Sequence, residues 1–91
     1  MANQYGNLGL IYEKRGDLDE AEKLQRKGLD IDEKLGRLEG MAIGYGNLGS
    51  VFAKRGDLDE VRRLWTKARD QFAQIGMPHM VERVQGWLDR L

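Results

Sequence analysis

The 91-residue chain contains no cysteine, a single proline and no long apolar run. The lack of cysteine excludes disulfides, thiolate catalysis and cysteine-based metal sites. Basic and acidic side chains number 15 each, so the formal net charge is zero. Because no block of like charge occurs, electrostatics favours neither nucleic acid nor a membrane as partner. No segment approaches the roughly 18 apolar residues that cross a bilayer, and we expect a cytoplasmic protein.

What the sequence does contain is an internal repeat. Shifting residues 1–40 by 40 positions onto residues 41–80 gives 18 identities. The segment YGNLG occurs near the start of each half, and KRGDLDE occurs in the middle of each half. A period between about 20 and 50 residues is typical of stacked supersecondary units, none of which buries its apolar face alone. The repeat therefore predicts a solenoid.

The local pattern within each unit predicts two helices joined by a short turn. In the first unit, apolar residues recur at three- and four-residue spacing up to Arg15. Gly16 suits the left-handed position that closes a helix. Asp17 with Glu20 forms an aspartate version of the capping box, which starts the next helix. We thus expect two helical hairpins.

The expected helices differ in which residues they bury. The first carries a stripe of Tyr5, Leu8, Ile11 and Tyr12. The second, ending at about Leu35 before Gly36, buries Leu18, Ala21, Leu24, Gly28 or Leu29, Ile31 and Leu35. The third ends at about Arg55, and the fourth buries Val61, Leu64, Trp65, Ala68, Phe72 and Ile75. Pro78 pre-sets a fifth helix, with a stripe of Met80, Val81, Val84, Leu88 and Leu91.

The predicted architecture is all-α, a solenoid of two hairpins and a capping helix within one domain over residues 1–91. Repeat 1 covers residues 1–40, repeat 2 covers residues 41–77, and residues 78–91 form a capping helix or a half repeat. The first helix lacks a preceding polar cap, so we expect another repeat or a second copy of the chain to cover it.

The repeat resembles the tetratricopeptide repeat over essentially the whole chain. The resemblance rests on the small and aromatic positions of both units, namely Tyr5, Leu8, Gly9, Tyr12, Gly16 and Ala21, with Tyr45, Leu48, Gly49, Phe52, Gly56, Trp65 and Ala68. The 40-residue period is similar to the long-helix branch found in scaffold proteins and bacterial peptide-sensing regulators. The resemblance implies a module that holds a peptide or a partner helix on the concave surface lined by the first helix of each unit.

The first unit departs from the family pattern in ways that predict loose packing. Gln25 stands where a large apolar residue is usual, and Gly28 replaces an alanine. The resemblance accounts for Gly9 and Gly49 as the places where the two helices of a hairpin cross. It does not account for the further glycines Gly6, Gly40, Gly44 and Gly46, although missing side chains would widen a groove.

Placing the family's groove positions on this chain gives a set of candidate partner-binding residues. They are Asn3, Asn7, Leu10, Glu13 and Lys14 in the first helix, Ile43, Asn47, Ser50 and Lys54 in the third, and Arg83, Trp87 and Arg90 in the fifth. Asn7 and Asn47 are the strongest candidates, because amides pair with the main chain of an extended ligand irrespective of its sequence.

Each candidate also has a structural interpretation. The asparagines can simply tie helices together, and Lys14 and Lys54 suit the negative ends of helix dipoles. Trp87 is either an anchor for a partner or a lid over the end of the stack.

No constellation for catalysis is visible. Ser50 and Thr66 have no base within reach in the sequence, and His79, the only histidine, has no second ligand for a metal. We therefore predict a non-enzymatic protein without cofactor or metal. Its predicted function is protein or peptide binding, as part of a larger scaffold or regulator; the alternative is a self-associating structural unit that forms homo-oligomers.

Overall fold

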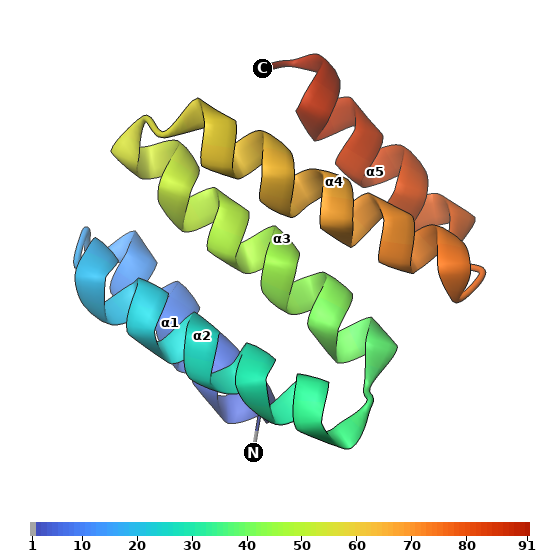
Figure 1. The fold of residues 1–91 in the computed structure, drawn as a ribbon. Coiled ribbons are helices and arrows are strands. Elements are labelled where there is room, and N and C mark those ends of the chain that lie inside the picture. Colours follow the sequence, from blue (N-terminus) through green and yellow to red (C-terminus); the bar gives the residue numbers. More distant parts are fainter. Residues whose placement is uncertain (1) are drawn as a thin grey trace.

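The computed structural model describes residues 2–91, and the side chains from Gln4 onward. This range folds into five helices, α1 (Ala2–Lys14), α2 (Leu18–Leu35), α3 (Leu38–Arg55), α4 (Leu58–Gln74) and α5 (Pro78–Asp89). Successive helices are antiparallel neighbours, with α1 at one end of the stack and α5 at the other (Figure 1). The stack is flat, measuring 32 × 31 × 18 Å. The predicted all-α solenoid of two hairpins and a fifth helix is confirmed.

Each turn is closed by a glycine in the left-handed region. Gly16 and Gly56, with φ of 84° and 81°, end the first helix of each hairpin, and Gly36 and Gly76 end the second. Only glycine adopts this conformation without steric cost. The four turns therefore recur every 20 residues, which explains why the whole unit repeats every 40.

The helices that follow the Gly-Asp turns begin as the sequence predicts. The side chains of Asp17 and Asp57 each accept a hydrogen bond from a backbone N–H three residues later, that of Glu20 or Glu60, at 3.3 Å. These bonds satisfy donors that have no partner within the helix. Pro78 occupies the first turn of α5, where its missing N–H leaves no bond unmade.

The apolar core lies mainly between α3, α4 and α5. Its buried members are Leu29, Ala42, Tyr45, Leu48, Leu64, Ala68, Phe72, Val84 and Leu88. Only one of these, Leu29, comes from the first hairpin, where Ala21 and Leu24 are buried separately. The second hairpin together with α5 therefore contains most of the packed apolar surface.

Some expected core positions are instead exposed. Leu8 and Ile11 are 42% and 46% exposed, since they lie on a side of α1 that no described helix covers. Leu35 is 60% exposed because it is the last residue of α2, directly before the turn. Leu91 is also exposed, and it lies beyond the end of α5. The predicted apolar stripes were wrong at these positions.

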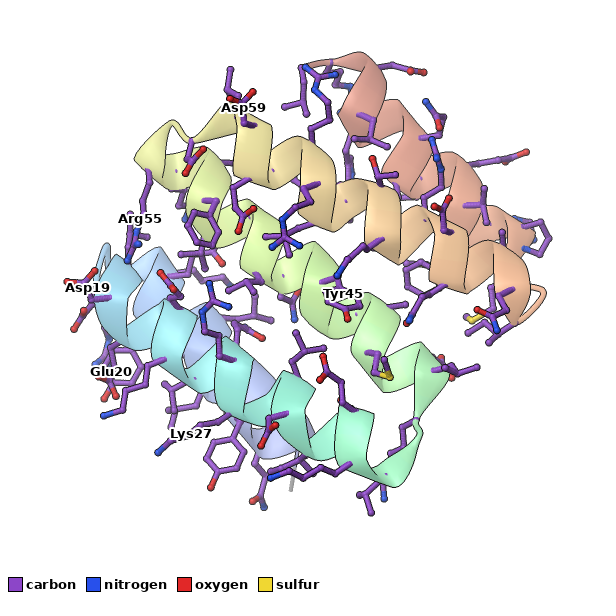
Figure 2. The ribbon with its side chains drawn as sticks, in the orientation of Figure 1. Asp19, Glu20, Lys27, Tyr45, Arg55 and Asp59 are labelled. Atoms are coloured by element: carbon purple, nitrogen blue, oxygen red, sulfur yellow. The ribbon has the colours of Figure 1, made fainter. Side chains whose placement is uncertain are left out.

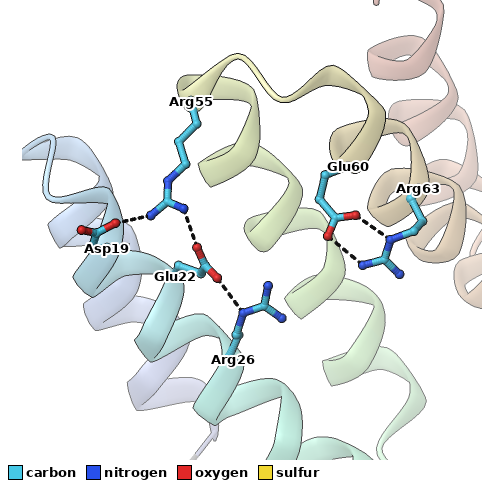
Figure 3. Close-up of polar contacts among 6 residues, drawn as sticks. All are labelled: Asp19, Glu22, Arg26, Arg55, Glu60 and Arg63. Atoms are coloured by element: carbon cyan, nitrogen blue, oxygen red, sulfur yellow. Dashed lines mark hydrogen bonds and ion pairs between the residues drawn. The ribbon is translucent and has the colours of Figure 1, made fainter.

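An ion-pair network joins the two hairpins at the end of α3. Arg55 pairs with Asp19 at 2.5 Å and with Glu22 at 2.7 Å, both on α2 (Figures 2 and 3). Glu22 also accepts a bond from Arg26 at 2.8 Å. The guanidinium of Arg55 lies 5.6 Å from the ring centre of Phe52. Exposed ion pairs stabilise little individually, and this network links the end of α3 to the first half of α2.

Close contact between the helices of each hairpin depends on a glycine. A methyl group at Gly49 would overlap the indole nitrogen of Trp65, and one at Gly9 would lie 2.7 Å from Nε2 of Gln25. At Gly86 in α5, by contrast, a methyl group would meet no heavy atom within 4 Å.

We predict opposite effects for two glycine-to-alanine substitutions. Gly49→Ala should lower the free energy of unfolding by about 1–3 kcal/mol, because Trp65 must move. Gly86→Ala, the matched control, should raise it by up to about 1 kcal/mol, through helix propensity alone. Urea denaturation followed by circular dichroism measures both. Equal effects of the two substitutions would contradict the proposed helix contact.

Candidate functional site

A groove of about 380 Å³ opens between α1 and α3, with α2 as its floor. Four glycines, three amides, three apolar residues and one carboxylate line it. They are Gly6, Gly28, Gly40 and Gly44; Asn7, Gln25 and Asn47; Leu10, Leu29 and Ile43; and Asp32. The volume falls within the range of about 300–1,000 Å³ that is usual for ligand sites.

The two asparagines that the sequence singled out lie on opposite walls of this groove. Asn7 comes from α1 and is exposed, and Asn47 comes from α3 and is partly exposed. Leu10 and Ile43 flank them on the same two helices. The structure thus brings together Asn7, Leu10, Ile43 and Asn47 from the predicted set, and their role in binding stays a prediction.

Gln25 forms the floor of the groove. Its side chain is 2% exposed, and its Nε2 donates a hydrogen bond to the carbonyl oxygen of Gly6 at 3.0 Å. The equivalent residue of the second hairpin, Trp65, donates from Nε1 to the carbonyl oxygen of Gly46 at 3.1 Å. Gln25 therefore donates a hydrogen bond equivalent to that of Trp65, but its side chain fills less volume.

The same comparison extends to six of the eleven residues that line the groove. Moving 40 positions along the chain replaces each of these six with a larger residue. The pairs are Gln25 and Trp65, Gly28 and Ala68, Asp32 and Phe72, Gly40 and Met80, Gly44 and Val84, and Asn47 and Trp87. The interval between α3 and α5 is thus filled at the positions where the interval between α1 and α3 is hollow.

Trp87 belongs to the filled interval. Its ring lies 5.3 Å from that of Trp65, tilted by 51°. A methyl group at Gly46 would lie 3.8 Å from the same ring, so Gly46 lets the indole approach α3. The sequence left two interpretations of Trp87 open, a lid over the end of the stack and an anchor for a partner. This packing favours the lid.

Asp32 carries the only charge among the described residues that line the groove. Its side chain is on the last turn of α2, and the residue is 6% exposed. A methyl group at Gly40 would lie 2.5 Å from a carboxylate oxygen. The sequence did not account for Gly40. The structure does, because a glycine at this position leaves room for the Asp32 carboxylate. Gly44 similarly leaves room for Leu29, which would lie 3.2 Å from an added methyl group.

Other predicted residues are already engaged by a buried glutamate. Ser50 Oγ donates to Glu13 Oε2 at 2.8 Å, and Lys54 Nζ lies 3.4 Å from the same oxygen. Lys54 also donates to the carbonyl oxygen of Glu13 at 3.3 Å. Glu13 itself is buried, and its Oε1 has no partner among the described residues. These contacts tie α1 to α3 beyond the groove, and any further role of Ser50 and Lys54 stays a prediction.

Three further predicted residues are not part of the groove lining. Lys14 is exposed at the end of α1, and Arg83 and Arg90 are exposed on α5 and just after it. The side chain of Asn3, which was also predicted, lies outside the described residues.

Sequence reasoning missed the floor of the groove. The predicted positions lie on α1, on α3, and on or just after α5. The floor consists of Gln25, Gly28, Leu29 and Asp32, which all come from α2. The signal was available in the alignment of the two halves, where Gln25, Gly28 and Asp32 correspond to the larger residues Trp65, Ala68 and Phe72.

Three pKa shifts occur away from the groove. Burial raises the pKa of the Tyr45 hydroxyl, and the charge of Glu33, which accepts its hydrogen bond at 3.3 Å, raises it further. On α4, hydrogen bonding from Arg63 holds the pKa of the Glu60 carboxyl below its usual value, and the same hydrogen bond raises the pKa of the Arg63 guanidinium. None of these residues lines the groove, so the groove chemistry is that of amides, one carboxylate and apolar side chains.

Within residues 2–91, no helix combines the length and apolar character needed to span a bilayer. In the same range, no three histidine or acidic side chains gather as they would around a metal ion.

Comparison with known proteins places the chain in a family. A family model described as tetratricopeptide repeat matches residues 1–74, which run to the end of α4. A search of curated proteins finds no match. Repeats of this kind generally mediate protein–protein interaction and are generally not enzymes. The hairpin stack and the match over residues 1–74 agree, and the chain belongs to the tetratricopeptide repeat family.

Proposed function

We propose that this chain binds an extended segment of a partner protein in the groove between α1 and α3. The observation that carries the proposal is the difference between the two intervals of the stack. Where Trp65 and Trp87 fill one interval, Gln25 and Asn47 leave the other open. Large residues in the same register would close the groove and add buried apolar area, so an open groove is best explained by an occupant.

The chemistry of the walls supports an extended occupant. Asn7 and Asn47 face the groove from opposite sides, and each amide offers both a donor and an acceptor. An extended main chain presents the same two kinds of group along its length, so it can pair with both walls irrespective of sequence. Leu10, Leu29 and Ile43 supply apolar contacts for one or two of its side chains.

Removing both amides should abolish binding without unfolding the protein. The probe is a peptide selected from a random phage-displayed library against the unaltered chain. Asn7→Ala combined with Asn47→Ala should weaken its binding by about 10-fold or more, because main-chain bonds are lost. Calorimetry measures the affinity, and circular dichroism checks the helicity. Lys23→Ala with Arg62→Ala, both exposed outside the groove, is the control. Unchanged affinity in the asparagine variant would contradict the proposal.

Filling the groove should separate binding from stability. Gln25→Trp places the residue of the second hairpin into a setting that already has Gly9 and the Gly6 carbonyl in the matching positions. We expect the urea midpoint to stay the same or rise, since apolar area is buried. The selected peptide should no longer bind measurably. Gln74→Trp, the same change at an exposed site on α4, should leave binding intact.

A second candidate function, self-association, is favoured by the apolar face of α1. Leu8 and Ile11 are exposed, whereas their equivalents Leu48 and Val51 are fully buried where α3 packs between α2 and α4. A second copy of the chain docking on α1 would cover these residues, as the neighbouring helices do for α3.

Light scattering at several concentrations tests self-association. If the face of α1 forms the contact, the apparent mass should exceed that of the monomer and rise with concentration. Leu8→Glu with Ile11→Glu should restore the monomer mass, because charges in an apolar contact are costly. Two substitutions at exposed polar positions, Lys23→Glu and Arg62→Glu, are the control. A monomer at every concentration would rule out this second function.

A further inference from the structure

We propose that the groove selects a lysine or arginine side chain of the bound segment, and that Asp32 pairs with its positive charge. The inference rests on the proposed function, because it assumes that a peptide lies between α1 and α3. It concerns only which side chain the peptide must present at one position.

The first argument is the charge of the lining. Of the eleven described residues around the groove, ten are neutral, and the exception is the carboxylate of Asp32. Four of the other five acidic residues on α2, namely Asp19, Glu22, Asp30 and Glu33, bond to or pair with Arg55, Arg26, Lys34 and Tyr45. The fifth, Glu20, does not line the groove. None of the described side chains from Gln4 to Leu91 forms such a bond with Asp32. Residue Asp32 is only 6% exposed, and a cation in the groove would offset the cost of partly desolvating its charge.

The second argument is the space around the carboxylate. Gly40 places no side chain against it, whereas any β-carbon there would lie 2.5–2.8 Å from its three terminal atoms. Asp32 lines the groove together with Gly28, Gly40 and Gly44. The carboxylate is therefore part of the groove wall, where a group that enters the groove can meet it.

The third argument is the match in shape. Leu10, Leu29 and Ile43 form the apolar part of the lining, and Asp32 is its charged part. Lysine and arginine combine a long aliphatic stem with a cationic end, and they bury the stem along apolar surface. Asp32 is also in the last turn of α2, where the helix dipole favours a cation. A short side chain would not extend along the apolar residues, and an acidic side chain would be repelled by the carboxylate of Asp32.

The test uses peptides selected from a random phage-displayed library against the unaltered chain. We expect peptides that bind the groove to share a lysine or arginine at one position. Replacing that residue by norleucine keeps the aliphatic stem and removes the charge. This change should weaken binding by about 10-fold or more, as expected for a lost charge-assisted hydrogen bond.

Asp32→Asn should cause a similar loss, and the two changes together should cost no more than either alone, because both remove one interaction. Asp30→Asn is the matched control, since Asp30 lies on the same helix, outside the groove, and pairs with Lys34. It should leave the affinity unchanged. The norleucine peptide tests the pairing on the unaltered protein, so the inference does not depend on the folding of a variant.

Two outcomes separate this inference from the function on which it rests. Peptides that lose binding to Gln25→Trp but carry no common basic residue, and bind Asp32→Asn normally, would overturn the inference and leave the proposed function standing. Failure to select any peptide that depends on the open groove would overturn both.

Discussion

The whole stack depends on one contact that occurs twice, where the second helix of each hairpin approaches the first. A side chain on that helix, Gln25 or Trp65, donates to a backbone carbonyl of its neighbour while resting on a glycine. The glycine sets the distance between the helices, and the hydrogen bond sets their register. Because both hairpins keep this contact, the residue that makes it can change in volume without changing the fold.

Much of the fold follows from the sequence. The left-handed glycines, the Gly-Asp turns and the 40-residue repeat are local signals, and each determines a turn or a helix start. Which residues of α1 stay exposed did not follow, because burial depends on neighbours in space rather than on periodicity. Leu8 and Leu48 occur in the same segment, YGNLG, and yet only the second is buried.

The candidate site was predicted in part. Asn7, Leu10 and Asn47 were expected to face a groove, and they line one. The resemblance pointed only to the first helix of each unit, so it could not reveal a floor built by α2. Asp32 was not predicted to be part of the site, because acidic residues are frequent on the solvated faces of helices. Its carboxylate instead packs where a β-carbon of residue 40 would lie, which only a glycine there allows. The burial of Asp32 therefore depends on Asp32 and Gly40 together, and it cannot be predicted from either position alone.

The uneven core has a further consequence for how the molecule responds to occupancy. Most packed apolar surface lies between α3 and α5, so the first hairpin is attached by fewer apolar contacts. A ligand that contacts both α1 and α3 would add interactions between the first hairpin and the rest of the stack, where apolar contacts are fewest. Since a ligand that binds only the folded form stabilises it by mass action, occupancy would even out this difference and make the two hairpins melt together.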